Sequence, residues 1–362
     1  MTTATLKARV HCLRYEARDV VSVELRPEHA GVVFPPHAPG AHIDLHLDNG
    51  LVRSYSLLNP AGETGRYVVG VLKDRKSRGG SVFVHEQLRV GQLLTISAPR
   101  NNFPLHDSAA HSVFVAGGIG ITPILCMLDR LSASGRSADL VYCARSRADA
   151  AFLERLNELA SPTLRVHWHF DDEAGGPPDL RERLRPFAKH SHFYACGPGP
   201  MLDAFLSACE VLELPNAHIE RFAAVPTLTA STEPTTFTLE LRRSTRRIEV
   251  RADCSVLDAM LEAGLSPDHS CREGLCGACE TRVLAGEVEH LDSILTTPAA
   301  TATARSANPA PRGVGCRHAP SICCQWSTTT WSSHCQRPSP RSRTSTRRWS
   351  TVCCSISPHR PF

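Results

Sequence analysis

Hydrophobic residues follow two different patterns along the first 225 residues, and the change falls near residue 107. Up to that point short apolar runs and alternations are separated by Gly and Pro, which is typical of strands joined by turns. The expected strands are Leu6–Leu13, Val20–Leu25, His42–Leu47, Arg53–Leu58 and Tyr67–Leu72, with one short helix near Ser81–Leu88. Residues 1–106 are therefore predicted to form a small antiparallel β-barrel.

From residue 107 onward, short apolar strands alternate with helical segments. The expected strands are Ser112–Ala116, Asp139–Cys143, Leu164–His169 and His192–Cys196, and the expected helices are Thr122–Leu131, Ala148–Ala160, Leu180–Phe187 and Pro200–Leu212. This alternation predicts a doubly wound α/β domain over 107–225, in which helices cover both faces of a parallel sheet.

A third pattern begins after a Thr-, Ser- and Pro-rich segment, 226–235, which is typical of a linker. Phe237–Arg242 and Arg246–Val250 are predicted to form a hairpin. Ser255–Ala263 is predicted to be a helix with Ser255 as its N-cap, and a cysteine loop follows. We expect a small α+β domain over 236–295.

Charge is unevenly distributed along the chain. Its 362 residues include 40 Lys and Arg against 36 Asp and Glu, and nine of the Arg lie in 293–362, a segment with no acidic residue. The remainder is net acidic, so charge gives no reason to expect nucleic-acid or membrane binding. The sequence contains no apolar run of transmembrane length and no signal peptide, which predicts a cytoplasmic protein.

The composition changes again after Leu295. Residues 296–362 are rich in Ser, Thr, Arg and Pro, yet they hold six of the 15 Cys and three of the four Trp. Natural disordered segments tend to avoid aromatic residues and cysteine. We interpret this tail as translated out of frame; the alternative is a genuine Arg-rich extension that binds a partner.

A cysteine triplet, Cys271, Cys276 and Cys279, has the C-x4-C-x2-C spacing of plant-type [2Fe–2S] sites. In a reducing compartment such a group indicates a metal site rather than disulfides. Gly274 and Gly277 allow the loop to curl and to point amide N–H groups at the cluster sulfurs. A zinc loop or three unrelated buried thiols are the alternatives.

Two glycine-containing loops each follow a strand and open a helix. The first contains Gly117, Gly118, Gly120 and Thr122, and the second contains Cys196, Gly197 and Pro198. Both would lie at the carboxyl edge of one parallel sheet, where open α/β folds bind ligands. Together they predict a dinucleotide site, because glycine lets the backbone approach a pyrophosphate. Either loop alone would also fit a structural turn, with Cys196 as a packed small side chain.

Polar residues on one barrel strand suit a phosphate and a flat ring. Arg53 offers a planar fork for phosphate, and Tyr55 offers a ring face and a hydroxyl group. Gly80 and Ser81 open the short helix and would make a second anion site. A solvated strand face is the alternative, and the dinucleotide motifs that follow favour the cofactor.

In this order the motifs resemble the ferredoxin–NADP reductase superfamily, and within it the phthalate dioxygenase reductase and vanillate demethylase reductase type. The resemblance covers about residues 5–295. It rests on R-x-Y-S-L (53–57), R-G-G-S (78–81), P-R-N-x-F-P-L (99–105), G-G-I-G-I-T-P (117–123), C-G-P (196–198), E-R-F (220–222) and the cysteine spacing. It implies a flavin barrel, an NAD domain and a β-grasp ferredoxin domain.

The resemblance also implies residue roles. FMN, with FAD possible, would be held by Arg53, Tyr55, Ser56, Gly80 and Ser81. The nicotinamide path would be lined by Gly118, Thr122, Cys196 and Pro198, within the loops that also contain Gly117, Gly120 and Gly197. Phe222 would lie near the isoalloxazine, so the candidate catalytic residues are Tyr55, Ser56, Cys196 and Phe222. Asp171 and Asp172 follow the third strand of the α/β domain and would disfavour a 2′-phosphate, which predicts NADH over NADPH.

The expected activity is electron transfer from NADH through FMN and a [2Fe–2S] cluster to a Rieske-type oxygenase, by a chain that acts as a monomer. The family would add a fourth Cys ligand beyond Cys279. The candidates are Cys316, Cys323 and Cys324, or the ligand is absent. A flavin-only NADH oxidoreductase and a non-catalytic redox or zinc-binding module are the alternative functions.

Overall fold

The computed structural model describes residues 5–223, 236–242, 244–251, 253–285, 321–324 and 353–354. The chain divides into two compact units: one is Ala4–Val225, and the other is Pro226–Phe362 together with Met1–Thr3. The predicted linker lies outside the described residues, as does most of the tail. Within the described part of the chain, every helix is too short or too polar to cross a membrane.

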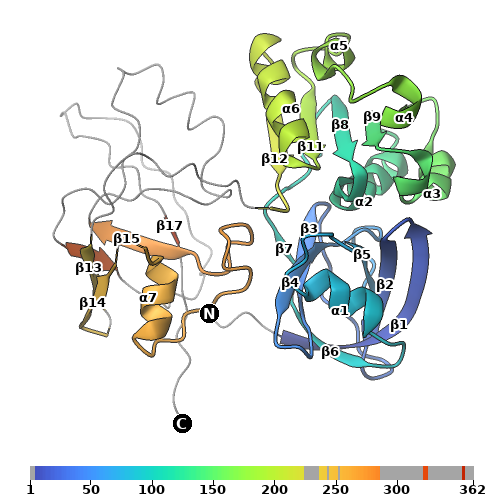
Figure 1. The fold of residues 1–362 in the computed structure, drawn as a ribbon. Coiled ribbons are helices and arrows are strands. Elements are labelled where there is room, and N and C mark those ends of the chain that lie inside the picture. The colour runs from blue at the N-terminus through green and yellow to red at the C-terminus, as the bar shows by residue number, and fades with distance from the viewer. Residues whose placement is uncertain are drawn as a thin grey trace, which may run out of the picture. The chain divides into compact units, whose positions relative to one another are not determined.

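The first unit begins with an antiparallel barrel whose strands are hydrogen-bonded in the order β4-β3-β6-β1-β2-β5, with β7 paired to β3 (Figure 1). A bridge between Leu57 and Val69 joins the two ends of this sheet. Helix α1 (Gly80–Glu86) packs Phe83 and Val84 into the barrel core. The strands are β1 (Thr5–Ala17), β2 (Val20–Pro27), β3 (Ala41–His46), β4 (Val52–Ser56), β5 (Tyr67–Leu72), β6 (Leu93–Ser97) and β7 (Arg100–Asn101).

The same unit continues into a parallel sheet with the strand order β10-β9-β8-β11-β12. Its strands are β8 (His111–Gly117), β9 (Ser137–Ala144), β10 (Leu164–Phe170), β11 (His192–Cys196) and β12 (Ala217–Glu220). Alternate residues of β8 serve two cores: Phe114 and Ala116 face one, and Val113 and Val115 face the other. The doubly wound architecture is confirmed.

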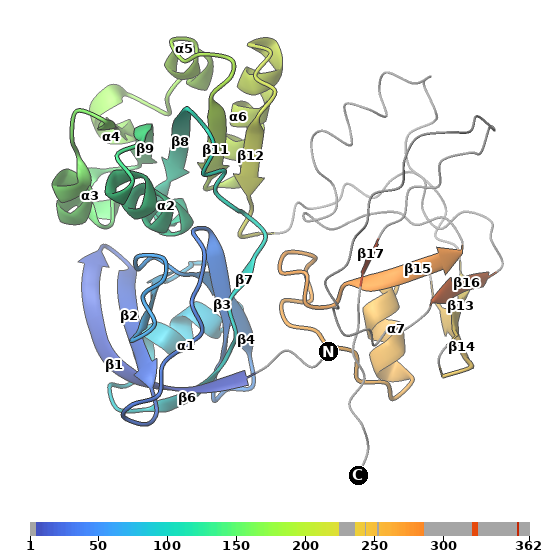
Figure 2. The same cartoon turned by 180° about the vertical axis from the view of Figure 1, so that it is seen from behind.

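Helices cover both faces of this sheet, as Figures 1 and 2 show. The helices are α2 (Ile121–Ala133), α3 (Leu153–Leu159), α4 (Asp171–Ala174), α5 (Leu180–Leu184) and α6 (Gly199–Val211), with 3-10 turns at Gly118–Gly120 and Arg147–Asp149. The single helix predicted over Ala148–Ala160 is wrong in its first half. Phe152 has a left-handed backbone, with φ at 63°, which separates the turn at Arg147 from α3.

The second unit contains a mixed sheet in the order β14-β13-β16-β15-β17. Its elements are β13 (Phe237–Leu241), β14 (Arg246–Val250), α7 (Val256–Glu262), β15 (Thr281–Ala285), β16 (Ser321–Cys324) and β17 (Cys353–Cys354). Ser255 is the N-cap of α7, as predicted, and its hydroxyl accepts from the Asp258 amide. Met260 of α7 packs on Leu239, Leu241, Ile248 and Val250.

Candidate functional site

The two glycine loops meet at the carboxyl edge of the parallel sheet. Ala116, at the end of β8, is in register with Cys196, at the end of β11, and the strand order reverses between these two strands. An added Cβ at Gly120 would lie 2.2 Å from the carbonyl oxygen of Cys196. The backbones are therefore in direct contact, and the switch point of the sheet lies where nucleotides bind in open α/β folds.

Both loops are held by contacts that leave their first glycines without room for a side chain. A Cβ at Gly117 would lie 2.7 Å from Met201, and one at Gly197 would lie 3.0 Å from the Gly117 backbone. The Tyr142 hydroxyl donates to the Gly118 carbonyl at 3.2 Å and accepts from the Ala151 amide at 3.0 Å. Gly118 has φ at 52° and open space above its Cα, which leaves its backbone accessible to a ligand.

The barrel contacts the start of α2. Thr122 is buried, its hydroxyl donates to the Ile119 carbonyl at 2.9 Å, and its methyl group faces Gly70 of β5. A Cβ at Gly70 would lie 2.7 Å from that methyl group. Thr122 therefore fixes the first glycine loop against the barrel as well as against its own helix.

Arg53 lies across the first residue of α1. A Cβ at Gly80 would lie 2.6 Å from Arg53 Cγ and 2.8 Å from its Nε. One guanidinium nitrogen donates to the Val52 carbonyl at 2.8 Å. The Ser81 hydroxyl donates to Ser77 and accepts from the Asp74 amide. A rigid cation thus lies beside first-turn amides that have no partner within the helix, which is a donor set that fits a phosphate.

A buried polar cluster joins the barrel to the parallel sheet. The Ser56 hydroxyl, at the end of β4, lies within hydrogen-bonding reach of the Glu220 carboxyl group, at the end of β12. Cys196 is fully buried and is in register with Glu220. Burial raises the pKa of Glu220 to about 8, opposed by the Ser56 hydrogen bond, and burial followed by the nearby Glu220 raises the pKa of Cys196 well above its ordinary value.

Glu220 is a candidate functional residue that the motif reading missed, since the E-R-F motif was used there only for its aromatic residue. Its second carboxyl oxygen is buried and makes no hydrogen bond to any residue that the structure describes. An unpaired buried oxygen is costly unless a ligand pairs with it. The hydroxyl of Ser56 and this carboxyl group therefore fit the polar rim of a bound isoalloxazine and nicotinamide pair.

The two aromatic residues of the predicted set have different environments. Tyr55 of β4 is partly buried, and burial raises its pKa to about 12, opposed by the neighbouring Arg53. Phe222 follows β12 and is 42% exposed. An exposed aromatic ring two residues beyond Glu220 is available to cover a flat ligand.

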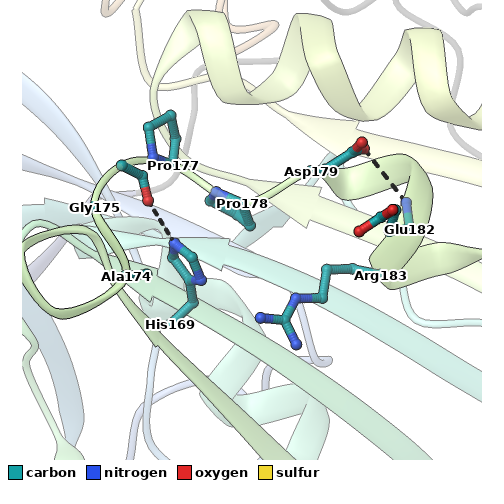
Figure 3. A pocket seen from close by; sticks show the side chains of 9 residues that line it. His169, Ala174, Gly175, Pro177, Pro178, Asp179, Glu182 and Arg183 are labelled. Carbon is teal, nitrogen blue, oxygen red and sulfur yellow. Dashed lines mark hydrogen bonds between the residues drawn. The ribbon is translucent and has the colours of Figure 1, made fainter.

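Asp171 begins α4, directly after β10, at the same edge of the sheet. Its carboxylate lies 3.5 Å from His169 Nε2, which also contacts the Gly176 carbonyl at 2.9 Å. His169 lines a cavity of about 550 Å³ together with the Gly175–Pro178 loop and residues of α5 (Figure 3). Arg183 also lines it, a cation that the motifs did not indicate.

In the second unit, the cysteine loop brings its thiols and amides together. Cys271 Sγ accepts from the amides of Glu273 and Leu275, each at 3.4 Å. The hydrogen bond from the Cys276 thiol lowers the pKa of Cys271 to about 6, and the same contact raises the pKa of Cys276. Arg272, Gly274 and Gly277 all have positive φ, which curls the loop.

These residues fit an iron–sulfur cluster. The loop turns amide N–H groups toward a sulfur atom, and the buried Ser270 hydroxyl next to it makes no hydrogen bond in the described residues. Amide donors to cysteine sulfur are the contacts that set cluster potentials. Of the three candidates for a fourth ligand, Cys316 lies outside the described residues, and Cys323 and Cys324 are described only as backbone of β16.

Comparisons with known proteins agree with this geometry. Residues 114–207 match the oxidoreductase NAD-binding domain family, and 239–321 match the 2Fe-2S iron-sulfur cluster binding domain family. Phenoxybenzoate dioxygenase subunit beta of Ectopseudomonas oleovorans is 45% identical over 82% of this chain and 90% of its own. Vanillate O-demethylase oxidoreductase of Pseudomonas sp. (strain HR199 / DSM 7063) is 40% identical over 79% of this chain and 90% of its own. The solved phthalate dioxygenase reductase, at 31% identity, has a TM-score of 0.62 and covers 88% of this chain and 98% of its own.

A flavin barrel, an NAD-binding sheet and an iron–sulfur loop in one chain define a modular NAD(P)H-dependent reductase of an oxygenase system. The chain belongs to the phthalate dioxygenase reductase and vanillate demethylase reductase family. The sequence-based predictions of the family, the fold class, the flavin, the 2Fe–2S cluster and electron transfer from NADH are confirmed.

Proposed function

We propose that this protein is the NADH-oxidising component of a Rieske-type oxygenase and that its flavin is FMN. Three observations support the proposal. The relatives' names include a dioxygenase subunit and a demethylase oxidoreductase. The close approach of Arg53 to Gly80 at one end of α1 would suit a compact phosphate site. The proximity of Ser56 and Glu220 brings a polar group of the barrel close to one of the parallel sheet, which supports a reaction centre between them.

Bound flavin and cluster supply the conversion of a two-electron hydride donor into a one-electron donor. The chain's own residues supply binding and position. Arg53 and the amides of Gly80 and Ser81 would hold the phosphate, and Tyr55 would cover one ring face. The packed loops at Gly117–Gly120 and Cys196–Pro198 would hold the nicotinamide close to the Ser56 hydroxyl, with Phe222 at the rim.

Ser56 and Glu220 are proposed to control the proton at the reaction centre. Burial raises the pKa of Glu220 to about 8, so its protonated carboxyl group can donate to the Ser56 oxygen, and the Ser56 hydroxyl can then donate toward a ring nitrogen. Ser56 is buried, as is one carboxyl oxygen of Glu220, which limits the access of water. The fully buried Cys196 has a raised pKa, so it would stay a neutral thiol rather than act as a nucleophile.

We also propose the domain boundaries 1–106, 107–225 and 236–295, with a linker at 226–235 and an atypical tail at 296–362. The change from the antiparallel to the parallel sheet between β7 and β8 supports the first boundary. Division of the chain at Val225 supports the second.

The test is an anaerobic titration of purified full-length protein with NADH, with flavin and iron quantified beforehand. The expected result is bleaching of the flavin band followed by reduction of a one-electron acceptor. Released FMN is identified by its mass after denaturation. Absence of a yellow chromophore, or a flavin band that NADH leaves unchanged, would contradict the proposal.

A further inference from the structure

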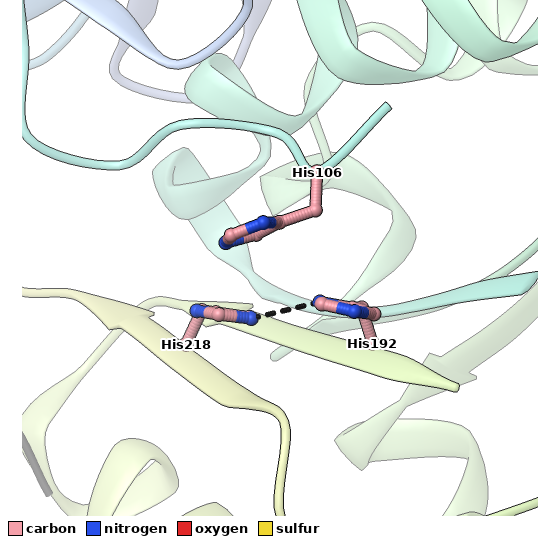
Figure 4. A group of neighbouring side chains, drawn as sticks. All are labelled: His106, His192 and His218. Atoms are coloured by element: carbon pink, nitrogen blue, oxygen red, sulfur yellow. Dashed lines mark hydrogen bonds between the residues drawn. The ribbon is translucent and has the colours of Figure 1, made fainter. Parts of the chain in front are cut away.

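Three histidines from separate segments meet on one face of the parallel sheet (Figure 4). His192 begins β11, His218 lies in β12, and His106 lies in the connector between β7 and β8. One nitrogen from each ring lies within 4.8 Å of the others. The family motifs used above contain none of these residues, and the reductase chemistry does not use them.

The sheet positions two of the rings rigidly. His218 is in register with Tyr194, and His192 is two residues from Tyr194 on the same face of β11. His192 Nδ1 and His218 Nε2 are 3.1 Å apart, and their rings are parallel within 5°. Both side chains are partly buried. Strand pairing and ring stacking therefore fix the positions of their ring nitrogens.

The connector brings the third ring over these two. The His106 amide donates to the Tyr194 hydroxyl at 2.9 Å, which fixes its backbone above the sheet. Its ring centroid lies 4.7 Å from those of both His192 and His218. His106 is exposed, so its ring can rotate toward the pair without disturbing the core.

The spacing suits a tetrahedral metal ion. With Zn–N bonds of 2.0–2.1 Å, two nitrogens of a tetrahedral site are about 3.3 Å apart. The 3.1 Å between His192 and His218 is close to that edge. Imidazole nitrogen is a preferred ligand of zinc, copper and nickel, and a set of three leaves one position for water.

We propose that His106, His192 and His218 form a binding site for a divalent transition-metal ion of the zinc class, separate from the iron–sulfur loop. The ion ties the interdomain connector to β11 and β12. Two residues further along the same face of these strands are Tyr194 and Glu220, and Cys196 follows Tyr194. The site therefore stabilises the two strands that carry the reaction centre. Two residues of a strand span about 7 Å, which is the separation between His218 and Glu220 along β12.

The experiment uses full-length, tag-free protein with its iron–sulfur cluster assembled, so that the loop cysteines are engaged by iron. Zinc sulfate is titrated by calorimetry, and thermal unfolding is recorded with and without zinc. The wild-type chain is expected to bind one zinc ion more than His106→Ala. Zinc should also raise the melting temperature of the wild-type protein, because an ion that binds only the folded state stabilises it.

His106→Ala is the main variant because this side chain is exposed and the backbone amide that bonds the Tyr194 hydroxyl is retained. His218→Gln tests a ring that is fixed in the sheet, and His29→Ala, an exposed histidine of the barrel unit, is the matched control. We expect His106→Ala to weaken zinc binding more than about tenfold and His29→Ala to leave it unchanged. Equal zinc binding and equal melting shifts in the wild type, His106→Ala and His29→Ala would overturn the proposal, as would no binding by the wild type.

Discussion

Gly120 and Cys196 are 76 residues apart, yet no atom fits between them: a Cβ on Gly120 would lie 2.2 Å from the Cys196 carbonyl oxygen and 2.7 Å from the Gly197 amide nitrogen. The backbone of Gly120 is helical, with φ at −61°. Conformational freedom is therefore not the reason that glycine occupies this position. The reason is the contact between two loops that form one nucleotide-binding edge.

Replacing Gly120 with alanine should separate these loops. The clash is with backbone, which cannot rotate away, so we expect a loss of about 1–3 kcal/mol of stability and a marked loss of NADH affinity. Gly65→Ala is the control, because a Cβ there meets nothing within 4 Å. Thermal unfolding and NADH titration of both variants provide the measurements. Unchanged NADH affinity in a folded Gly120→Ala protein would contradict the assignment of the site.

The Ser56–Glu220 hydrogen bond leads to a kinetic prediction. Ser56→Ala leaves the buried carboxyl group without its donor. A hydrogen bond to a charged or ionisable group is worth about 1.5–3 kcal/mol, so flavin reduction by NADH should slow by about 10- to 100-fold. Glu220→Gln keeps the shape and should lose less. Stopped-flow absorbance under anaerobic conditions measures the rate, and Glu213→Gln, an exposed carboxyl group of the same unit, is the control. Normal rates in Ser56→Ala would remove this pair from the reaction centre.

A buried ion pair should make the barrel sensitive to acid. Asp44 is 3% exposed and accepts from Arg100 Nη2 and from the Ser54 hydroxyl, both at 2.6 Å. Burial alone would raise the pKa of Asp44, but the charge and hydrogen bonds of Arg100 and Ser54 outweigh it and hold the pKa below its usual value. The stabilisation is therefore complete above the unfolded pKa of about 3.9 and is lost as the pH falls through the lower, folded pKa.

Asp44→Asn should accordingly lower the free energy of unfolding by about 3–5 kcal/mol at pH 7 and flatten its dependence on pH below about 4. Denaturant unfolding between pH 3 and 7 measures both effects. Asp19→Asn is the matched control, an exposed aspartate of the same barrel whose left-handed backbone asparagine also tolerates. Identical pH profiles for Asp44→Asn and the wild type would show that this pair does not govern acid stability.

A comparison of a cysteine in the loop with one outside it tests which thiols bind iron. Cys276 is 2% exposed and in contact with Cys271, whereas Cys254 belongs to the same unit but lies outside the loop. Cys276→Ser should abolish iron incorporation and electron transfer to a one-electron acceptor, while NADH still bleaches the flavin. Cys254→Ser should retain both iron and transfer. Iron analysis and visible spectra decide the matter, and full iron content in Cys276→Ser would exclude this residue as a ligand.

Asp171 is expected to select the dinucleotide. Removing its charge in Asp171→Asn should lower the preference for NADH over NADPH about tenfold, equivalent to about 1.4 kcal/mol, because a 2′-phosphate would no longer meet a carboxylate. Arg183 at the nearby cavity provides a positive charge that would then favour NADPH. The ratio of kcat/KM for the two nucleotides is the measurement, with Glu158→Gln of α3 as the exposed control. An unchanged ratio would place the ribose elsewhere.

Motif residues proved easier to predict than their partners. The strands of the barrel and of the parallel sheet were found from apolar periodicity, except for β6, β7 and β12. β7 and β12 have too few residues to give a pattern, whereas β6 was missed although it lies between β3 and β1 in the barrel sheet. Gly120 and Cys196 were both named from their loops. Glu220 and Arg183 were missed as site residues, because a single carboxylate or guanidinium next to a motif looks the same in sequence whether it faces solvent or a buried site.

The sequence by itself determined the order of the modules, the cofactor classes and the candidate cysteine ligands, because these depend on local periodicity and on the spacing of reactive side chains along the chain. Only the tertiary structure showed that Ser56 and Glu220 lie within hydrogen-bonding reach of each other. It also showed that His106, His192 and His218 meet on one face of the sheet. The physical reason is strand pairing. Register between β11 and β12, and the path of the connector after β7, bring distant residues within bonding distance, and no local pattern records that register.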